Sequence, residues 1–104
     1  INVPGSFELA MGAQLLIKSK SPEAVICLGS IIRGETPHFE FVSNACAQGI
    51  MDVGIKNNVP VIFGVLTTEN MQQAVDRAGG KYGNKGDEAA ITALKMAALR
   101  EKLI

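Results

Sequence analysis

The fold is decided by the run Ala24-Val25-Ile26-Cys27-Leu28, a short and continuous stretch of apolar residues. A run of this kind is typical of a parallel strand that is buried on both faces. A second run, Pro60-Val61-Ile62-Phe63-Gly64-Val65-Leu66-Thr67, has the same character. Its proline stands at the edge, where no ladder donor is lost. The sequence therefore predicts two buried strands.

Apolar residues at helical spacing predict a helix before each strand. The first runs from Phe7 to about Lys20, with Ser6 as its N-cap. Its expected inward residues are Phe7, Met11, Leu15 and Leu16. The second continues to about Asn57, with Thr36 as cap and Pro37 in the first helical position. Its expected inward residues are Phe39, Val42, Cys46, Ile50 and Val53.

Two further helices are predicted after the second strand. Thr68 is the expected cap of a short helix that ends at Arg77. A glycine-rich loop, Gly79–Gly86, follows, and Asn84 with Asp87 resembles a capping pair for the last helix. That helix runs to the C-terminus with Ile91, Leu94 and Ala98 on one face.

This order of elements predicts an α/β layered domain with a parallel sheet. The opening Ile1-Asn2-Val3-Pro4-Gly5 reads like the end of a strand that runs into a turn. Because two strands are too few for a stable sheet, we expect a preceding segment to supply the remainder. Residues 1–104 are thus expected to form one domain that is incomplete at its N-terminal side.

Composition excludes several classes of protein. Ten Lys and Arg balance ten Asp and Glu, which argues against binding to nucleic acid or to an anionic membrane. Aromatic residues make up 5% and tryptophan is absent, so base-stacking platforms are not expected. Cys27 and Cys46 lie in apolar stretches and His38 is the single histidine. This pattern predicts two reduced core thiols and no metal site.

Chemistry is expected where the parallel strands end, because ligands of such sheets bind at the carboxyl edge. The segment Arg33-Gly34-Glu35-Thr36-Pro37-His38 follows the first strand. Free N–H groups at a helix start and the Thr36 hydroxyl are suited to an anion. Plain helix capping explains the same residues.

Other candidates also carry two interpretations. His38 lies in the first turn of a predicted helix, where the helix dipole favours the neutral imidazole. A neutral imidazole can accept and return protons. A surface histidine without a catalytic role is the simpler alternative. Arg77, with Lys81 and Lys85 beside the glycine-rich loop, suits a phosphate or a solvated salt bridge. Glu8 is a helix-cap residue or a substrate contact.

Four motifs occur in a characteristic order: Val3-Pro4-Gly5-Ser6-Phe7-Glu8, Gly29 to Phe39, Val59 to Thr68, and Arg77 to Gly86. With these motifs the chain resembles 6,7-dimethyl-8-ribityllumazine synthase over essentially its whole length. The resemblance implies a flavodoxin-like, three-layer domain with a four-stranded parallel sheet flanked by helices. It also implies that a first strand and helix, and an aromatic ring that stacks on the substrate, are supplied outside this chain.

The family condenses 5-amino-6-(D-ribitylamino)uracil with 3,4-dihydroxy-2-butanone 4-phosphate in riboflavin biosynthesis, and it needs neither a metal nor an organic cofactor. The resemblance makes His38 the proton-transfer residue. It assigns the butanone phosphate to Glu35, Thr36 and Arg77, and it places Lys85 and Glu88 near the ribityl chain and phosphate. The expected contacts of the ribitylaminouracil are Ser6, Phe7, Glu8, Ser30, Ile31, Ile32 and Phe63.

Partners follow from the same resemblance. Phe63 and Arg77 would come from a neighbouring subunit of a homo-oligomer. The family forms pentamers, some members close twelve pentamers into a sixty-subunit icosahedral shell, and the Gly79–Gly86 loop resembles the shell-forming version. The resemblance also implies riboflavin synthase as a further protein partner. The expected compartment is the cytoplasm, or a plastid if the source is a plant. The alternatives are a shell-forming relative without catalysis and a phosphate- or flavin-binding module.

Overall fold

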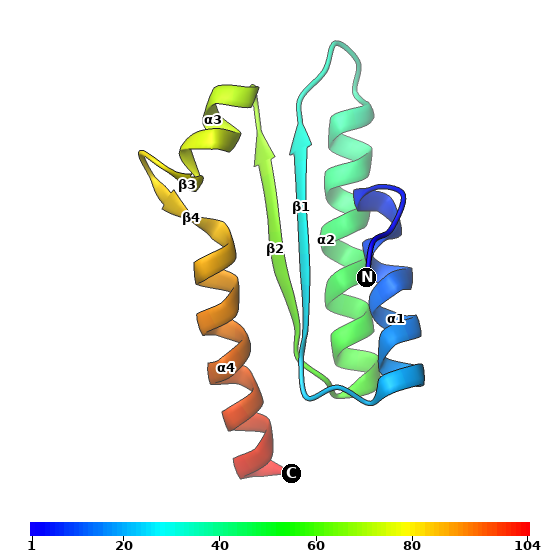
Figure 1. Ribbon diagram of the computed structural model, residues 1–104. Helices are drawn as coiled ribbons and strands as arrows, with labels where there is room; N and C mark the ends of the chain where they lie inside the picture. The colour runs from blue at the N-terminus through cyan, green and yellow to red at the C-terminus, as the bar shows by residue number, and fades with distance from the viewer.

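The computed structural model describes residues 1–104 as an α/β arrangement (Figure 1). A parallel pair of strands forms the centre. Helices α1 and α2 lie on one side of it and α4 lies on the other. The elements are the 3-10 turn η1 (Ser6–Glu8), α1 (Leu9–Lys20), β1 (Val25–Ile32), α2 (His38–Asn57), β2 (Val61–Thr68), α3 (Met71–Asp76), β3 (Ala78–Gly80), β4 (Gly83–Asn84) and α4 (Lys85–Leu103). The predicted α/β layering and parallel pairing are confirmed.

Strands β1 and β2 pair in parallel along their whole length, from Val25 opposite Val61 to Ile32 opposite Thr68. Strand β1 continues four residues beyond the predicted end at Leu28. At the start of the strand pair, Val25 N–H donates a 2.9 Å hydrogen bond to the Pro60 carbonyl. Pro60 thus contributes an acceptor just outside the strand, as its edge position requires.

The two faces of β1 are not equally covered. Val25, Cys27 and Ile31 are buried in the core that β1 and β2 share with α1 and α2. Ile26 and Leu28 point to the other face and are 41% and 60% exposed. The prediction that this strand is buried on both faces is therefore wrong. Figure 1 shows the reason, since α4 lies alongside β2 and leaves the neighbouring part of β1 open.

Both cysteines are free and buried in this core. Burial raises the pKa of the Cys27 thiol from its ordinary value of 9.0 to about 11, and the charge of Cys46 adds to the shift. Burial also raises the pKa of Cys46. Desolvation disfavours the thiolate, so these groups behave as small apolar side chains.

Helix α1 differs from its prediction at the start and in its inward face. Ser6 opens a 3-10 turn and makes no cap hydrogen bond, and the α-helix begins at Leu9. The residues that turn inward are the small Gly12 and Ala13. The predicted inward residues Phe7, Met11 and Leu15 are exposed, whereas Leu16 packs against the core as predicted.

Helix α2 ends at Asn57 and turns the predicted face inward, with Cys46 and Ile50 almost fully buried. Its start is one residue later than predicted. Pro37 stands at the N-cap, and its carbonyl accepts from Glu40 N–H at 3.0 Å. Thr36 lies outside the helix, where its hydroxyl accepts a long 3.4 Å bond from His38 N–H.

The C-terminal part follows the predicted order with two corrections. Thr68 ends β2, and the cap of α3 is Asn70, whose side chain accepts from Gln73 N–H at 2.8 Å. The glycine-rich loop contains the short antiparallel hairpin of β3 and β4. Asn84 caps α4 as predicted, through a 3.1 Å bond from Asp87 N–H.

The face of α4 that contacts the sheet also differs from the prediction. Ala89 and Ala93 are buried against Ile62. Ile91 and Leu94, which the hydrophobic pattern placed inward, are 54% and 74% exposed. None of the helices is both long enough and apolar enough to span a membrane.

Candidate functional site

A hollow of about 310 Å³ lies where β1 ends and α2 begins. The turn η1 closes one side of it with Ser6, and the strand end supplies Ser30 and Ile32. Thr36 and His38 come from the loop and the first turn of α2. Its lining residues are Ser6, Ser30, Ile31, Ile32, Gly34, Thr36, His38, Phe39 and Val42. Side chains that are far apart in the sequence thus meet at the carboxyl edge of the sheet, as predicted.

The start of α2 gives this hollow its polar character. The first N–H groups of a helix have no intrahelical acceptor, and their dipoles favour a bound anion. His38 is exposed and stands as the first residue of the 20-residue helix. An imidazole here can exchange protons with a molecule held at the same helix terminus.

A second group of candidates gathers around α4 and the hairpin. Arg77, Lys85 and Glu88 line a hollow of about 380 Å³ with the end of β2 and with Tyr82. Lys85 and Glu88 also line an adjoining hollow of about 310 Å³, which contains Phe63. Neither hollow shares a residue with the one that contains His38. The chain therefore presents most of the predicted residues as two separate groups.

Positive charge dominates the second group. The guanidinium of Arg77 lies 5.1 Å from the centre of the Tyr82 ring, and the Lys81 ammonium lies 5.3 Å from the same centre. The ion pairs of the structure all involve Arg33, so Arg77, Lys81 and Lys85 have no carboxylate partner. Cations without a direct ion pair, beside the N-terminus of α4, are suited to a phosphate.

The Arg77 backbone is held by its neighbours. Its N–H donates to the Ala74 carbonyl at 3.2 Å, and its own carbonyl accepts from Lys85 N–H at 2.8 Å. Gly80 packs so closely under α3 that an added Cβ would lie 2.7 Å from the Val75 carbonyl oxygen. The hairpin thus fixes the point from which the guanidinium extends.

Three predicted site residues lie outside both groups. Phe7 is 61% exposed on η1, and Glu35 is exposed in the loop before α2. The Glu8 carboxylate turns back toward Gly5, where its Oε1 would lie 3.2 Å from an added Cβ. No group of three or more His, Cys, Asp or Glu side chains is arranged to hold a metal ion.

The sequence of this chain matches the family model described as 6,7-dimethyl-8-ribityllumazine synthase over residues 1–101. The chain belongs to this family. Curated relatives of the same name agree with the match. The one from Cytophaga hutchinsonii is 67% identical over 97 residues, which cover 93% of this chain and 61% of the relative. The one from Parabacteroides distasonis is 57% identical over 94 residues, which cover 90% of this chain and 59% of the relative.

A third relative, from Phocaeicola vulgatus, is 54% identical over 101 residues, which cover 97% of this chain and 60% of the relative. The chain therefore spans about three fifths of the length of the curated lumazine synthases that it matches. The parallel pair flanked by helices agrees with the flavodoxin-like fold that the family resemblance implied.

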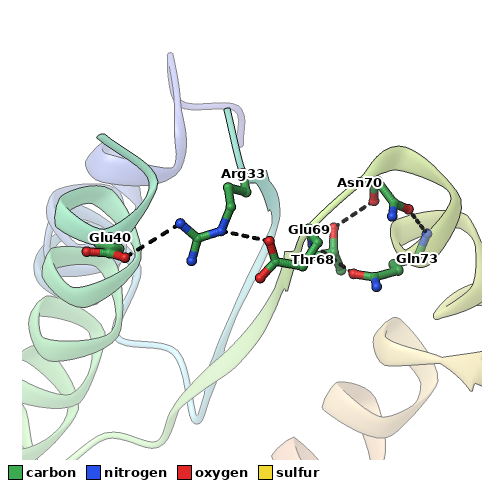
Figure 2. Close-up of polar contacts among 6 residues, drawn as sticks. All are labelled: Arg33, Glu40, Thr68, Glu69, Asn70 and Gln73. Carbon is green, nitrogen blue, oxygen red and sulfur yellow. Dashed lines mark hydrogen bonds and ion pairs between the residues drawn. The ribbon is translucent and has the colours of Figure 1, made fainter. Parts of the chain in front are cut away.

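Sequence reasoning assigned no role to Arg33 within the lumazine synthase motif. In the structure its guanidinium reaches two carboxylates, Glu40 and Glu69 (Figure 2). Phe39 and Val42 also line the hollow, although the helical pattern identified them only as core residues. The position of Arg33 just before the turn at Gly34 was the one sequence feature that could have indicated a role for it. Its partner Glu69 follows a different strand, so the two side chains become neighbours only in the folded chain.

A larger hollow lies elsewhere. It has a volume of about 430 Å³ and sits between the C-terminal ends of α2 and α4, at the amino end of the strands. Its lining is mainly apolar, including Met51, Ile55, Leu99 and Leu103. It contains none of the residues with acid–base or anion-binding chemistry described above.

Proposed function

We propose that the protein to which this chain belongs catalyses the condensation of 5-amino-6-(D-ribitylamino)uracil with 3,4-dihydroxy-2-butanone 4-phosphate. The products are 6,7-dimethyl-8-ribityllumazine, phosphate and water. The observation that carries the proposal is the meeting of Ser6, Ser30, Thr36 and His38 around one hollow, in a chain of the lumazine synthase family. Residues 1–104 then form part of a single catalytic domain of a transferase in riboflavin biosynthesis.

The reaction needs proton transfers and a place for a departing phosphate. The substrate amine attacks the ketone, and loss of water gives an imine. Elimination of phosphate then leaves an enol, which tautomerises to a ketone on the neighbouring carbon. The second amine attacks this new carbonyl, and loss of water completes the ring. His38 is the residue of the hollow suited to taking up and returning these protons. Holding both reactants together supplies much of the remaining acceleration.

We assign the phosphate to the loop before α2. Thr36 offers a hydroxyl, and the helix start offers N–H groups and a favourable dipole. Glu35 stands in the same loop. Ser30, Ile31 and Ile32 form the slot for the pyrimidine, and Ser6, Phe7 and Glu8 are placed on the adjoining turn to contact the ribityl-bearing substrate.

A homo-oligomer with shared sites is the second part of the proposal. It is supported by the separation of Phe63, Arg77, Lys85 and Glu88 from the hollow of His38. We propose that a second copy brings its Phe63 to the pyrimidine and its Arg77 to the phosphate. A pentamer has this head-to-tail geometry, since a heterologous contact closes into a ring. We further propose that pentamers close into a shell and that the protein associates with riboflavin synthase. Both of these proposals rest on the family resemblance alone.

The activity is tested with the full-length protein and both substrates, without an added cofactor. Lumazine absorbance and released phosphate are followed in the same sample. We expect equal amounts of the two products. A folded oligomer that gives no lumazine above the uncatalysed rate would remove the enzymatic proposal and favour a non-catalytic shell or binding protein.

Shared sites are tested by mixing two impaired variants, His38→Ala and Arg77→Ala, and assaying them at a butanone phosphate concentration well below the KM of the Arg77→Ala variant. If each site takes its histidine and its arginine from different copies, reassembled mixed oligomers contain some sites with both residues. Activity of the mixture should then exceed that of either variant alone. Mixed oligomers with no gain in activity would show that both residues serve the same copy's site.

A further inference from the structure

Arg33 joins three segments at the carboxyl edge of the sheet. Its backbone N–H, just after β1, donates to the Thr68 carbonyl at 2.8 Å. Its Nε lies 2.7 Å from Glu69 Oε2, and its Nη1 lies 3.5 Å from Glu40 Oε1 (Figure 2). The same guanidinium lies 4.6 Å from the centre of the Phe39 ring. One side chain thus connects the end of β1, the first turn of α2 and the segment after β2.

These contacts bracket the loop proposed to hold the phosphate. Arg33 precedes Gly34 and Glu40 follows His38, so their ion pair closes the intervening segment. At its end the Pro37 carbonyl accepts from Glu40 and Phe41 N–H, and before that point the structure contains only the long 3.4 Å bond between Thr36 and His38. An added Cβ at Gly34 would meet nothing within 4 Å. The shape of the loop therefore depends on what holds its two ends.

The partner Glu69 is itself held in place. Its N–H donates to Gln73 Oε1 at 2.8 Å, and the Thr68 hydroxyl donates to the Asn70 carbonyl at 3.0 Å. Asn70 in turn caps α3 through a 2.8 Å bond from Gln73 N–H. The hydrogen-bonded turn in Figure 2 presents the carboxylate of Glu69 to Arg33 from a fixed backbone.

Arg33 is not arranged as a ligand of the substrate. It does not line the hollow that contains His38, whereas Phe39, on which it lies, does. Its charge is already opposed by two carboxylates. Arg77 differs in both respects, because it lines a hollow and has no carboxylate partner.

We propose that Arg33 is a positioning residue that, through Glu40 and Glu69, holds the loop 34–37 and the His38 turn in the shape that receives a phosphate-bearing substrate. The inference rests on the proposed function and adds a residue to it. Arginine suits this task because its planar fork can meet two carboxylates and an aromatic ring at once. A lysine carries the same charge but offers a single point of contact.

The test compares Arg33→Met, Arg33→Lys and Glu69→Gln in the full-length protein. Two mechanisms predict opposite results. If Arg33 positions the loop, all three variants raise the KM for the butanone phosphate by about three- to tenfold. If Arg33 acts only as a positive charge near the phosphate, Glu69→Gln lowers that KM and Arg33→Lys leaves it unchanged. Either of these last two results would overturn the proposal.

Two controls complete the design. Glu23→Gln removes an exposed carboxylate that takes part in no ion pair, and it should leave KM unchanged. Titration with inorganic phosphate measures anion binding without the reaction. Weaker phosphate binding in Glu69→Gln supports positioning even if the parent forms no lumazine, and tighter or unchanged binding contradicts it. A parent without activity would by itself count only against the proposed function.

Discussion

Leu28 of β1 lies opposite Gly64 of β2 and occupies the space that a side chain at residue 64 would need. An added Cβ at Gly64 would lie 2.8 Å from Leu28 Cδ2 and 2.9 Å from the Cys27 carbonyl oxygen. The Ala89 Cβ of α4 would be 3.2 Å away. The sheet and α4 can therefore approach each other at this point only because residue 64 has no side chain.

Gly64→Ala should accordingly lower the free energy of unfolding by about 1–3 kcal/mol, the usual cost of overpacking. One of the obstructing atoms belongs to the backbone, so the clash cannot be relieved by a side-chain rotation alone. Urea unfolding of the full-length protein measures the change. Gly34→Ala is the matched control, because an added Cβ there meets nothing within 4 Å. Equal stability losses in the two variants would contradict the packing argument.

Because the Cys27 thiol is buried, the free energy of unfolding should decrease as the pH rises above 9. Its pKa is about 11 in the folded chain and 9.0 as an ordinary thiol, so the unfolded chain loses this proton first. Stability from this group is complete below pH 9 and declines as the pH rises toward 11, by about 2–3 kcal/mol in total. The slope of unfolding free energy against pH should become shallower in Cys27→Ala. An unchanged slope between pH 9 and 11 would refute the assignment.

Asn84 should stabilise the start of α4. Its side-chain oxygen accepts from Asp87 N–H at 3.1 Å, and loss of such a cap costs about 1 kcal/mol. Asn84→Ala should lower stability by that amount, and Asn84→Asp should retain most of it. Thermal unfolding compares the three proteins. A similar loss in both variants would mean that the amide group contributes through something other than this acceptor.

Arg77→Ala should act on phosphate binding more than on the chemical steps. The guanidinium has no carboxylate partner and is held beside Tyr82, so its charge is free for an anion. We expect the KM for the butanone phosphate to rise by about tenfold or more, since charged hydrogen bonds are worth about 1.5–3 kcal/mol. The KM for the ribitylaminouracil should change little. Steady-state kinetics with each substrate varied in turn distinguishes the two effects.

The sequence predicted the order and type of the elements better than their inward faces. The helix from His38 to Asn57 was placed with the correct buried residues because its large apolar side chains repeat at helical spacing. In α1 and α4 the buried residues are the small Gly12, Ala13, Ala89 and Ala93, although Leu16 packs beside them as predicted. A hydrophobic pattern favours large residues, whereas close approach of a helix requires small ones, so the pattern missed these four positions.

The position of the hollow was predictable where it depended on chain order. Ser30 and Ile32 lie at the carboxyl end of β1, a few residues before the start of α2, so they line the same hollow as His38. The link from Arg33 to Glu69 was not predictable, because it joins segments after two different strands through side chains. The separation of Arg77 from His38 likewise depends on where the hairpin folds relative to the sheet.

We propose that lumazine is formed in the hollow that contains His38. The most direct test is kcat for His38→Ala in the full-length protein, measured beside the Kd for inorganic phosphate. Loss of a general acid–base residue should lower kcat by about 100-fold, with phosphate binding within about twofold of the parent. A kcat equal to that of the parent would contradict the account and place the reaction elsewhere on the molecule.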